Sequence, residues 1–235
     1  MKKIIALLFT LLILAAPASA KPVADEYRSS GYDFSKIKTV LVMPVMYDVA
    51  APSTESFFEE KTAQRWRDLT AQSRMPFLVK TPAEVVERDN FVKGTVETER
   101  LSPTKTAERA LALSNQYVDA VLTANVTRCG HNSIHHPQEI VWHTRYEKRD
   151  VWVRDHWEQH EYPVRYQEIK PAWDEVTTIG SVKLELRDAK SSDNTLIYGV
   201  SVTAETGDDL FTSAPTLTKH IGNVLANAVK RIPKK

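Results

Sequence analysis

The sequence predicts an α/β (α+β) fold in which helices pack on a mixed β-sheet. Three observations carry this prediction. Short β-branched runs alternate with amphipathic helical patterns in the first half of the chain, strand-like patterns fill most of the second half, and the chain ends in a helical stripe of apolar residues. Each such element has one apolar face, and helices that cover a sheet bury those faces together.

The first half of the chain begins with a polar segment, residues 21–36, which we interpret as a lead-in. Residues 39–45 form a β-branched run that indicates a buried strand ending at Pro44. A helix is expected next, over about residues 55–72, because apolar side chains recur there at helical spacing. A second short strand is expected over residues 75–80.

Two further helices precede a central strand. Thr81 can cap a helix that starts at Pro82, and Glu84 is placed to close a capping box with that threonine. Another helix is expected to begin at Pro103, since proline is favoured in the first helical turn. The apolar run over residues 117–126 then predicts a strand in the middle of the sheet.

The second half of the chain favours strands. A long aromatic and charged hairpin region is expected at about residues 138–174. Residues 181–187 alternate between apolar and polar side chains, which is typical of a strand with one exposed face. A polar turn and an apolar strand over residues 196–203 complete a second hairpin. Residues 217–232 carry apolar side chains at helical spacing and predict a C-terminal amphipathic helix.

Residues 1–20 have the pattern of a cleavable signal peptide. Two lysines precede a predominantly apolar run, residues 4–16, which as a helix spans roughly 20 Å and is too short for the roughly 30 Å of a bilayer core. Small residues follow, and cleavage is expected between Ala20 and Lys21. The chain is therefore expected to be periplasmic or secreted, with a single domain over residues 21–235. No cysteine for lipidation follows the apolar run, so no stable membrane anchor is expected.

Composition excludes several classes of function. The 31 basic and 30 acidic side chains nearly balance, so no general attraction to nucleic acid is expected. Cys129 is the only cysteine, which makes an intramolecular disulfide impossible. The sequence contains neither a glycine-rich phosphate loop nor a nucleophile elbow. No catalytic residues are assigned, and these absences favour a protein that is not an enzyme.

Three segments have structural motifs that occur together in other proteins. They are the strand over residues 40–45, which ends near a proline, the strand over residues 118–122, in which Asp119 stands between an apolar and a small residue, and the hairpin over residues 184–198. These segments resemble a group of bacterial envelope proteins. The group comprises the amino-terminal domain of the Tol-system β-propeller protein, lipoprotein activators of penicillin-binding proteins, curli-secretion channel proteins and related uncharacterised families. The resemblance implies a periplasmic binding or assembly module with no catalytic residues to carry over.

Six of the seven histidines gather between residues 131 and 160, close in sequence to Cys129. Imidazole and thiolate ligands suit zinc, copper or nickel. Two histidine pairs have i, i+4 spacing, which brings both rings to one ion on a helix but separates them by roughly 13 Å on a strand. We interpret residues 131–137 as a loop and residues 156–160 as strand or irregular structure. The candidate metal ligands are His131, His135, His136, His156 and His160. The alternative is a polar surface in which histidine is simply frequent.

The same stretch concentrates aromatic residues among charges of both signs. Trp, Tyr and Arg are the residue types that dominate interface hot spots, whereas the accompanying acidic residues argue against a nucleic-acid surface. A hairpin that packs one aromatic face on the sheet would explain part of this composition. The remainder predicts an exposed surface for an envelope protein partner or for self-association. The candidate surface residues are Trp142, Tyr146, Trp152, Trp157, Tyr162 and Tyr166.

Two hypotheses of function follow from these patterns. The first is an exported, non-catalytic binding or assembly module of the bacterial cell envelope that acts through the aromatic and charged surface. The alternative is a histidine-rich periplasmic protein that binds or depends on a divalent transition metal. No other cofactor is expected from the sequence.

Overall fold

The computed structural model describes residues 21–49, 55–95, 101–207 and 213–233. The expected signal peptide, residues 1–20, lies outside the described residues. The chain forms two compact units, which we name the core unit (Met1–Asn132 and Thr177–Lys235) and the hairpin unit (Ser133–Val176). No helix within the described ranges is long and apolar enough to cross a membrane.

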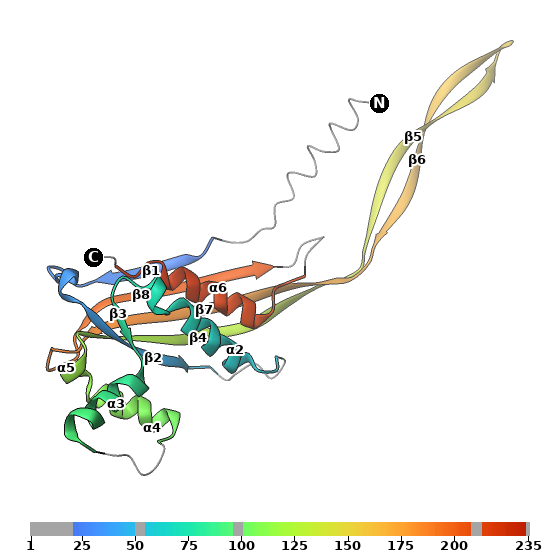
Figure 1. Ribbon diagram of the computed structural model, residues 1–235. Coiled ribbons are helices and arrows are strands. Elements are labelled where there is room, and N and C mark those ends of the chain that lie inside the picture. Colours follow the sequence, from blue (N-terminus) through green and yellow to red (C-terminus); the bar gives the residue numbers. More distant parts are fainter. Residues whose placement is uncertain (1–20, 50–54, 96–100, 208–212, 234–235) are drawn as a thin grey trace. The chain divides into compact units, whose positions relative to one another are not determined.

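A six-stranded sheet organises the core unit (Figure 1). Its strands are β1 (Val23–Arg28), β2 (Thr39–Tyr47), β3 (Leu78–Lys80), β4 (Ala120–His136), β7 (Trp173–Asp188) and β8 (Leu196–Gly207). The last four residues of β4 and the first four of β7 belong to the hairpin unit. Their order across the sheet is β1-β8-β7-β4-β2-β3. β2 pairs in parallel with β3 and β4, whereas β8 pairs antiparallel with β1 and β7. The sheet is therefore mixed, as the sequence predicts.

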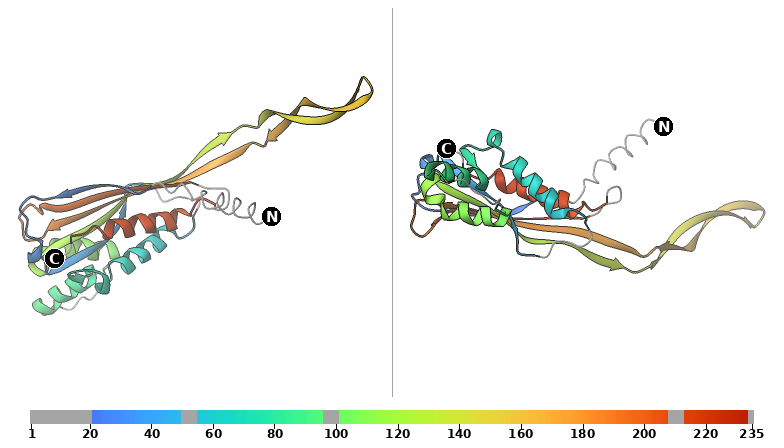
Figure 2. Two further views of the ribbon diagram at one scale, coloured as in Figure 1. Left: turned by 90° about the horizontal axis from the view of Figure 1, so that it is seen from above. Right: turned by 60° about the horizontal axis from the view of Figure 1, so that its bottom comes forward.

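Helices cover both faces of β2. α2 (Phe58–Leu69) and α6 (Leu217–Val229) lie side by side (Figure 2), and α3 (Pro82–Lys93) contacts α4 (Pro103–Ala112). The buried side chains of α2 and α6 form one cluster with Val40 and Val42, whereas those of α3 and α4 form another with Leu41. Side chains alternate along a strand, so the two helix pairs lie on opposite faces of β2. The short elements are α5 (Ser114–Tyr117) and two 3-10 helices, η1 (Phe34–Lys36) and η2 (Gln72–Arg74).

The predicted capping box at the start of α3 is formed. The hydroxyl of Thr81 accepts from the Glu84 backbone N–H at 3.3 Å, and the Glu84 carboxylate accepts from the Thr81 backbone N–H at 2.7 Å. Two donors that a helix start would leave unpaired are thereby satisfied. A Ser102 hydroxyl caps α4 in the same way, by accepting from the Lys105 backbone N–H.

The hairpin unit contains a two-stranded antiparallel sheet of β5 (Glu139–Val153) and β6 (His156–Lys170). Arg154 and Asp155 form the turn, both with positive φ (51° and 124°). Left-handed backbone at a two-residue turn matches the right-handed twist of the flanking strands. The predicted α/β fold, with its long hairpin in the second half and its C-terminal helix, is confirmed.

Three local interpretations of the sequence are wrong. The strand expected to end at Pro44 continues as β2 to Tyr47, because a register shift between Val42 and Val45 accommodates the proline in its pairing with β4. The polar lead-in over residues 21–36 contains β1, which pairs with β8 at the edge of the sheet although most of its side chains are exposed. The supposed loop that begins at His131 is instead the last part of β4, which continues to His136. β1 and the last part of β4 are held in the sheet by backbone hydrogen bonds. Because such bonds form with any side chain, these strands need no apolar pattern in the sequence.

Matched prolines separate β4 and β7 from β5 and β6. β4 ends at His136 and β5 begins at Glu139, with Pro137 and Gln138 between them. On the other side, Pro171 and Ala172 stand between β6 and β7. Proline has no backbone N–H and cannot donate to a ladder. The hydrogen-bonded ladder is therefore interrupted on both strands where the ribbon of β5 and β6 begins.

Candidate interaction surface on the hairpin

The pairing register sorts the hairpin side chains onto two faces. Trp152 lies opposite Trp157, and His143 lies opposite Tyr166. Residues directly opposite each other share a face, and successive residues alternate between faces. The first face, which we call the aromatic face, carries Ile140, Trp142, Tyr146, Trp152, Trp157 and Ile169. The second, which we call the histidine face, carries His143, His156, His160, Tyr162 and Tyr166.

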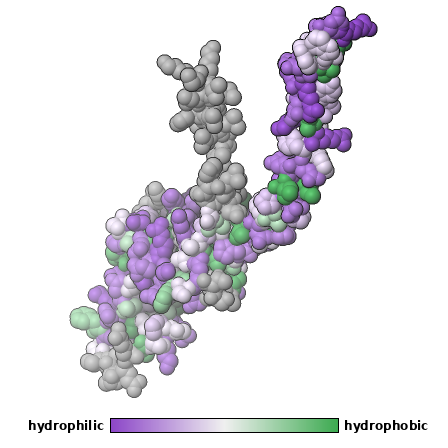
Figure 3. Space-filling model, turned by 90° about the vertical axis from the view of Figure 1, so that its right-hand side faces the viewer, coloured by the Kyte–Doolittle hydropathy of each residue, from purple (hydrophilic) through white to green (hydrophobic). Residues whose placement is uncertain are grey.

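The large side chains of the aromatic face are exposed to solvent. Their exposed fractions run from 51% for Ile140 to 68% for Tyr146. Trp152 and Trp157 contact each other edge to face next to the turn, with ring centroids 5.2 Å apart. Every residue of β5 and β6 that points to this face is exposed. A space-filling view shows apolar residues, in green, at the surface of the hairpin among hydrophilic ones (Figure 3).

Side chains of the histidine face contact one another. His143 stacks on Tyr166, with ring centroids 5.3 Å apart, and its Nε2 lies 2.6 Å from a carboxylate oxygen of Glu168. The guanidinium of Arg145 lies over the ring of Tyr166. Four valines of this face are half-buried: Val141, Val151, Val153 and Val164. The two faces therefore differ in kind, because only the histidine face pairs its side chains with one another over most of its length.

Charges on the aromatic face cancel. Lys148 and Arg165 are cationic, and Asp150 and Glu161 are anionic. The Lys148 ammonium lies 3.7 Å from the Glu161 carboxylate, across the two strands. This exposed pair contributes little stability by itself. The face is thus apolar and aromatic at its large side chains and electrically neutral as a whole.

The six predicted surface residues are divided between the two faces. Trp142, Tyr146, Trp152 and Trp157 come together on the aromatic face, whereas Tyr162 and Tyr166 lie on the histidine face. Sequence reasoning missed Ile140 and Ile169, which lie opposite each other and extend the aromatic face away from the turn. A signal for them was present, because a turn placed at Arg154 and Asp155 fixes which residues share a face.

The predicted metal ligands pair with different partners. His156 and His160 both contact the Glu158 carboxylate, at 2.8 and 3.1 Å, from opposite sides along the same strand. His135 contacts Asp174 at 2.7 Å, and His136 contacts Glu175 at 3.1 Å. His131 belongs to the core unit, where its Nδ1 lies 3.0 Å from the Thr178 hydroxyl.

The five candidate ligands do not converge on one point. Among the residues that the structure describes, no group of three or more His, Cys, Asp or Glu is placed to hold a metal ion. A zinc, copper or nickel site remains a prediction from sequence. Elemental analysis of protein purified without a histidine tag, before and after chelation, would test it directly.

The thiol of Cys129 is half-buried in the core unit and makes no disulfide. Burial, together with the negative charge of Glu55, raises the pKa of this thiol to about 11. The thiolate is the nucleophilic and metal-binding form. The raised pKa therefore favours the neutral thiol of Cys129 over the reactive thiolate at neutral pH.

Alkylation of Cys129 is accordingly expected to be slow in the native protein. At pH 8, each unit by which the pKa rises lowers the thiolate fraction about tenfold, so iodoacetamide should react roughly 100 times more slowly than with the unfolded chain. Mass spectrometry of quenched samples, native and in urea, measures both rates. Equal rates in the two states would show that burial does not protect this thiol.

Comparison with known proteins adds no family. No family model matches this sequence, and no curated protein matches it significantly. Among solved structures, the chain is similar to the PelC dodecamer from Paraburkholderia phytofirmans, with a TM-score of 0.40 and 12% identity over 92% of this chain and 99% of that chain. It is also similar to lipoprotein GNA1162 from Neisseria meningitidis, with a TM-score of 0.36 and 18% identity over 82% and 98%. The function proposed below rests on the residues of this chain alone.

Proposed function

We propose that this chain is a non-catalytic assembly module of the bacterial cell envelope, which associates with further copies of itself through the aromatic face of the hairpin. One observation carries the proposal. Six large apolar or aromatic side chains are gathered on one face of a two-stranded ribbon, and each is more than half exposed. These side chains lie in two groups on the face, separated by the pairs Lys148–Glu161 and Asp150–Gln159. Large exposed apolar side chains gathered on one face are typical of an interaction site.

The ribbon has a physical reason to acquire a partner. A two-stranded hairpin is marginally stable in water and usually needs further strands or a packed face. The histidine face supplies part of that stability through its own contacts, such as His143 with Glu168. On the aromatic face, the contact between side chains that stabilises the ribbon is chiefly that of Trp152 with Trp157. Burying it against another protein surface would release its ordered water and stabilise the ribbon.

The charge of the aromatic face favours a second copy as the partner. Two copies that meet through the same patch bring identical charges together. A strongly cationic or anionic patch would then repel itself, but here Lys148 and Arg165 balance Asp150 and Glu161. A neutral face with both signs can place each charge opposite its complement in a two-fold arrangement. An envelope protein of different sequence is the competing partner.

Localisation in the envelope rests on the sequence. Residues 1–20 have the pattern of a signal peptide, and the rest of the chain offers no second apolar stretch long enough to span a bilayer. The single cysteine is consistent with a chain that folds in an oxidising compartment without forming disulfides. Export would place the aromatic face where other envelope proteins and further copies are present.

Removing the aromatic face should abolish most of the self-association. Trp142, Tyr146, Trp152 and Trp157 are replaced together by threonine, which keeps a high preference for strands. Each buried aromatic anchor in an interface is worth about 1 kcal/mol or more, so the dissociation constant should rise at least roughly 100-fold. Sedimentation velocity over a range of protein concentrations measures it.

The matched control changes the opposite face. In this variant Tyr162 and Tyr166 become threonine, which removes aromatic area from the same strands but not from the aromatic face. It should associate as the unchanged protein does, while circular dichroism confirms that both variants keep their strands. The proposal fails if the unchanged protein is a monomer at every concentration, or if both variants lose association equally.

A further inference from the structure

A cavity of about 460 Å³ lies in the core unit between α2, β2, β3 and the start of α3. Its walls are mainly apolar and include Val42, Val45, Ala63, Trp66 and Val79. Cavities of this size and composition are typical of sites for small organic ligands. The hairpin does not line this cavity, and the proposed self-association does not use it. A ligand of the cavity would therefore be independent of the proposed function.

The strand connections create this cavity. The chain leaves β2 into α2 on one face of the sheet, and it leaves the neighbouring β3 into α3 on the other face. Adjacent parallel strands whose following helices diverge open a crevice at their carboxyl ends, where α/β proteins commonly bind ligands. β3 pairs with β2 only as far as Leu41 opposite Lys80. Residues 42–45 of β2 therefore continue past the end of β3 and form one wall.

The walls are held in place before any ligand arrives. Trp66 is only 2% exposed, and its indole N–H donates to the Met43 carbonyl at 2.8 Å. The amide of Gln72 donates to the Phe77 carbonyl and accepts from the Val79 backbone N–H, at 3.0 and 2.7 Å. These bonds fix an apolar slot at low further cost in conformational entropy on binding.

Two charged side chains line the cavity, and only one of them lacks a partner of opposite charge. Glu84 closes the capping box of α3 and lies 3.9 Å from the Lys80 ammonium. The Arg67 guanidinium donates instead to the neutral amide oxygen of Gln64, at 2.6 Å for one nitrogen. Within the described residues, no carboxylate lies within ion-pair distance of Arg67. The rim of the cavity thus carries a guanidinium without a direct ion pair. The nearest acidic group that it reaches is Asp68, through the Gln64 amide, which donates to that carboxylate at 2.9 Å.

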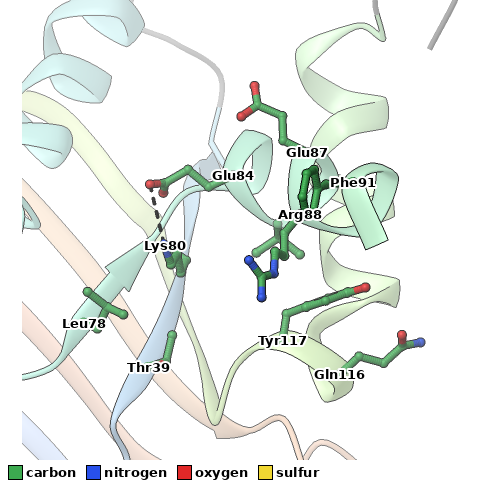
Figure 4. A pocket seen from close by; sticks show the side chains of 10 residues that line it. Thr39, Leu78, Lys80, Glu84, Glu87, Arg88, Phe91, Gln116 and Tyr117 are labelled. Carbon is green, nitrogen blue, oxygen red and sulfur yellow. Dashed lines mark ion pairs between the residues drawn. The ribbon is translucent and has the colours of Figure 1, made fainter. Parts of the chain in front are cut away.

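A neighbouring cavity shows the contrast. It has a volume of about 660 Å³ and lies on the other side of Glu84, between β3, α3 and α5. Figure 4 shows its lining, in which the side chains of Lys80 and Glu84 point toward each other and Arg88 and Glu87 add charges of both signs. Charges that already compensate one another offer no preference for an ionic ligand.

We infer that the cavity between α2 and α3 binds a small amphiphilic acid, with its apolar body against Trp66 and its carboxylate at Arg67. A planar guanidinium suits a carboxylate, which it can bind through two parallel hydrogen bonds. The apolar slot excludes a strongly hydrated ligand, because polar groups buried there would lose water without finding partners. Aliphatic and aromatic acids share this chemistry, and binding measurements with each distinguish them.

Titration calorimetry of the full chain tests the inference with decanoate, 2-naphthoate and decanol. One acid should bind with a stoichiometry of one, and decanol, which keeps the apolar body of decanoate without its charge, should bind more weakly. The variant Arg67→Gln should weaken binding of the acid about tenfold or more and leave decanol unchanged. The matched control is Arg65→Gln, which removes the same charge from α2 at a residue that does not line the cavity.

A second measurement locates the ligand. Of the five tryptophans, only Trp66 lies in the core unit, so replacing Trp142, Trp152, Trp157 and Trp173 by phenylalanine leaves it as the sole fluorophore. Binding of the acid should shift the emission of Trp66, and Ala63→Leu, which fills the cavity, should abolish both the shift and the heat. The inference is overturned if neither acid binds, if Arg67→Gln affects the acid and decanol equally, or if the acid binds without changing Trp66.

Discussion

A chain from which Ser133–Val176 is removed is expected to fold with nearly unchanged stability and to lose self-association completely. Neither cluster of buried residues in the core unit takes a member from this segment. Its removal therefore costs the core no apolar burial, and we expect the free energy of unfolding to change by no more than about 1 kcal/mol. The aromatic face, which carries the proposed association, is absent from the shortened chain.

The two ends left by this deletion are close enough to join. Contacts between β4 and β7 run from Thr123 with Glu185, through Thr127 with Ser181, to His131 with Thr178. Residue numbers rise on one strand as they fall on the other, so the strands are antiparallel and can be connected by a hairpin turn. An inserted Asn-Gly pair between Asn132 and Thr177 suits such a turn.

Urea unfolding followed by circular dichroism and sedimentation velocity measure the two expected outcomes. The full chain, taken through the same measurements, is the reference. A shortened chain that still associates at the same concentrations would place the interface in the core unit. A shortened chain that does not fold would show that the core depends on the hairpin, contrary to the division of the buried clusters.

The substitution Trp66→Ala is expected to cost the protein about 3–5 kcal/mol of unfolding free energy, the usual range for a buried tryptophan. Trp66 is 2% exposed and belongs to the main buried cluster, which α2 shares with α6 and the sheet. The truncation leaves a cavity and also deprives the Met43 carbonyl of its donor. Native proteins are stable by only about 5–15 kcal/mol, so this loss is a large share.

The control for this prediction is Trp66→Phe. Phenylalanine keeps most of the packed area but cannot donate to Met43, so its cost should fall to about 1–2 kcal/mol. Urea unfolding curves of the three proteins, analysed with a common slope, give both differences. A loss below about 1 kcal/mol for the alanine variant would mean that α2 is not anchored to the sheet through this side chain.

Elements whose stability comes from side chains were predictable from the sequence. The start of α3 follows from Thr81, Pro82 and Glu84, because a capping box uses side chains at fixed spacing. The C-terminal helix α6 follows from an apolar stripe that the structure buries. The long hairpin was expected from its composition, and the structure confirms it.

Elements held by backbone pairing were not predictable in the same way. β1 has one half-buried side chain among six residues, and its place at the sheet edge depends on hydrogen bonds to β8. The far part of β4, through His131 and His136, has a polar sequence that resembles a loop. The separation of Trp152 from Tyr162 onto different faces required the register, which composition does not specify.

The cavity beside Trp66 was also beyond sequence reasoning. Its lining comes from β2, α2, β3 and α3, which are adjacent only because successive connections cross the sheet in opposite directions. Trp66 and Arg67 are neighbours in sequence. The helical pattern predicts a core position for the tryptophan and a surface position for the arginine. Both side chains line one cavity because β2, β3 and the start of α3 enclose this part of α2.

The matched prolines at 137 and 171 have a consequence for how the hairpin can vary in length. Each strand of the ribbon advances about 3.3 Å per residue, and its faces repeat every two residues. Inserting or deleting two residues in both β5 and β6 would change the length by about 6.6 Å and keep every remaining aromatic side chain on its own face. Because Pro137 and Pro171 interrupt the ladder on both strands, such changes would stop short of β4 and β7. The span of the ribbon can therefore be set independently of the sheet from which the chain emerges.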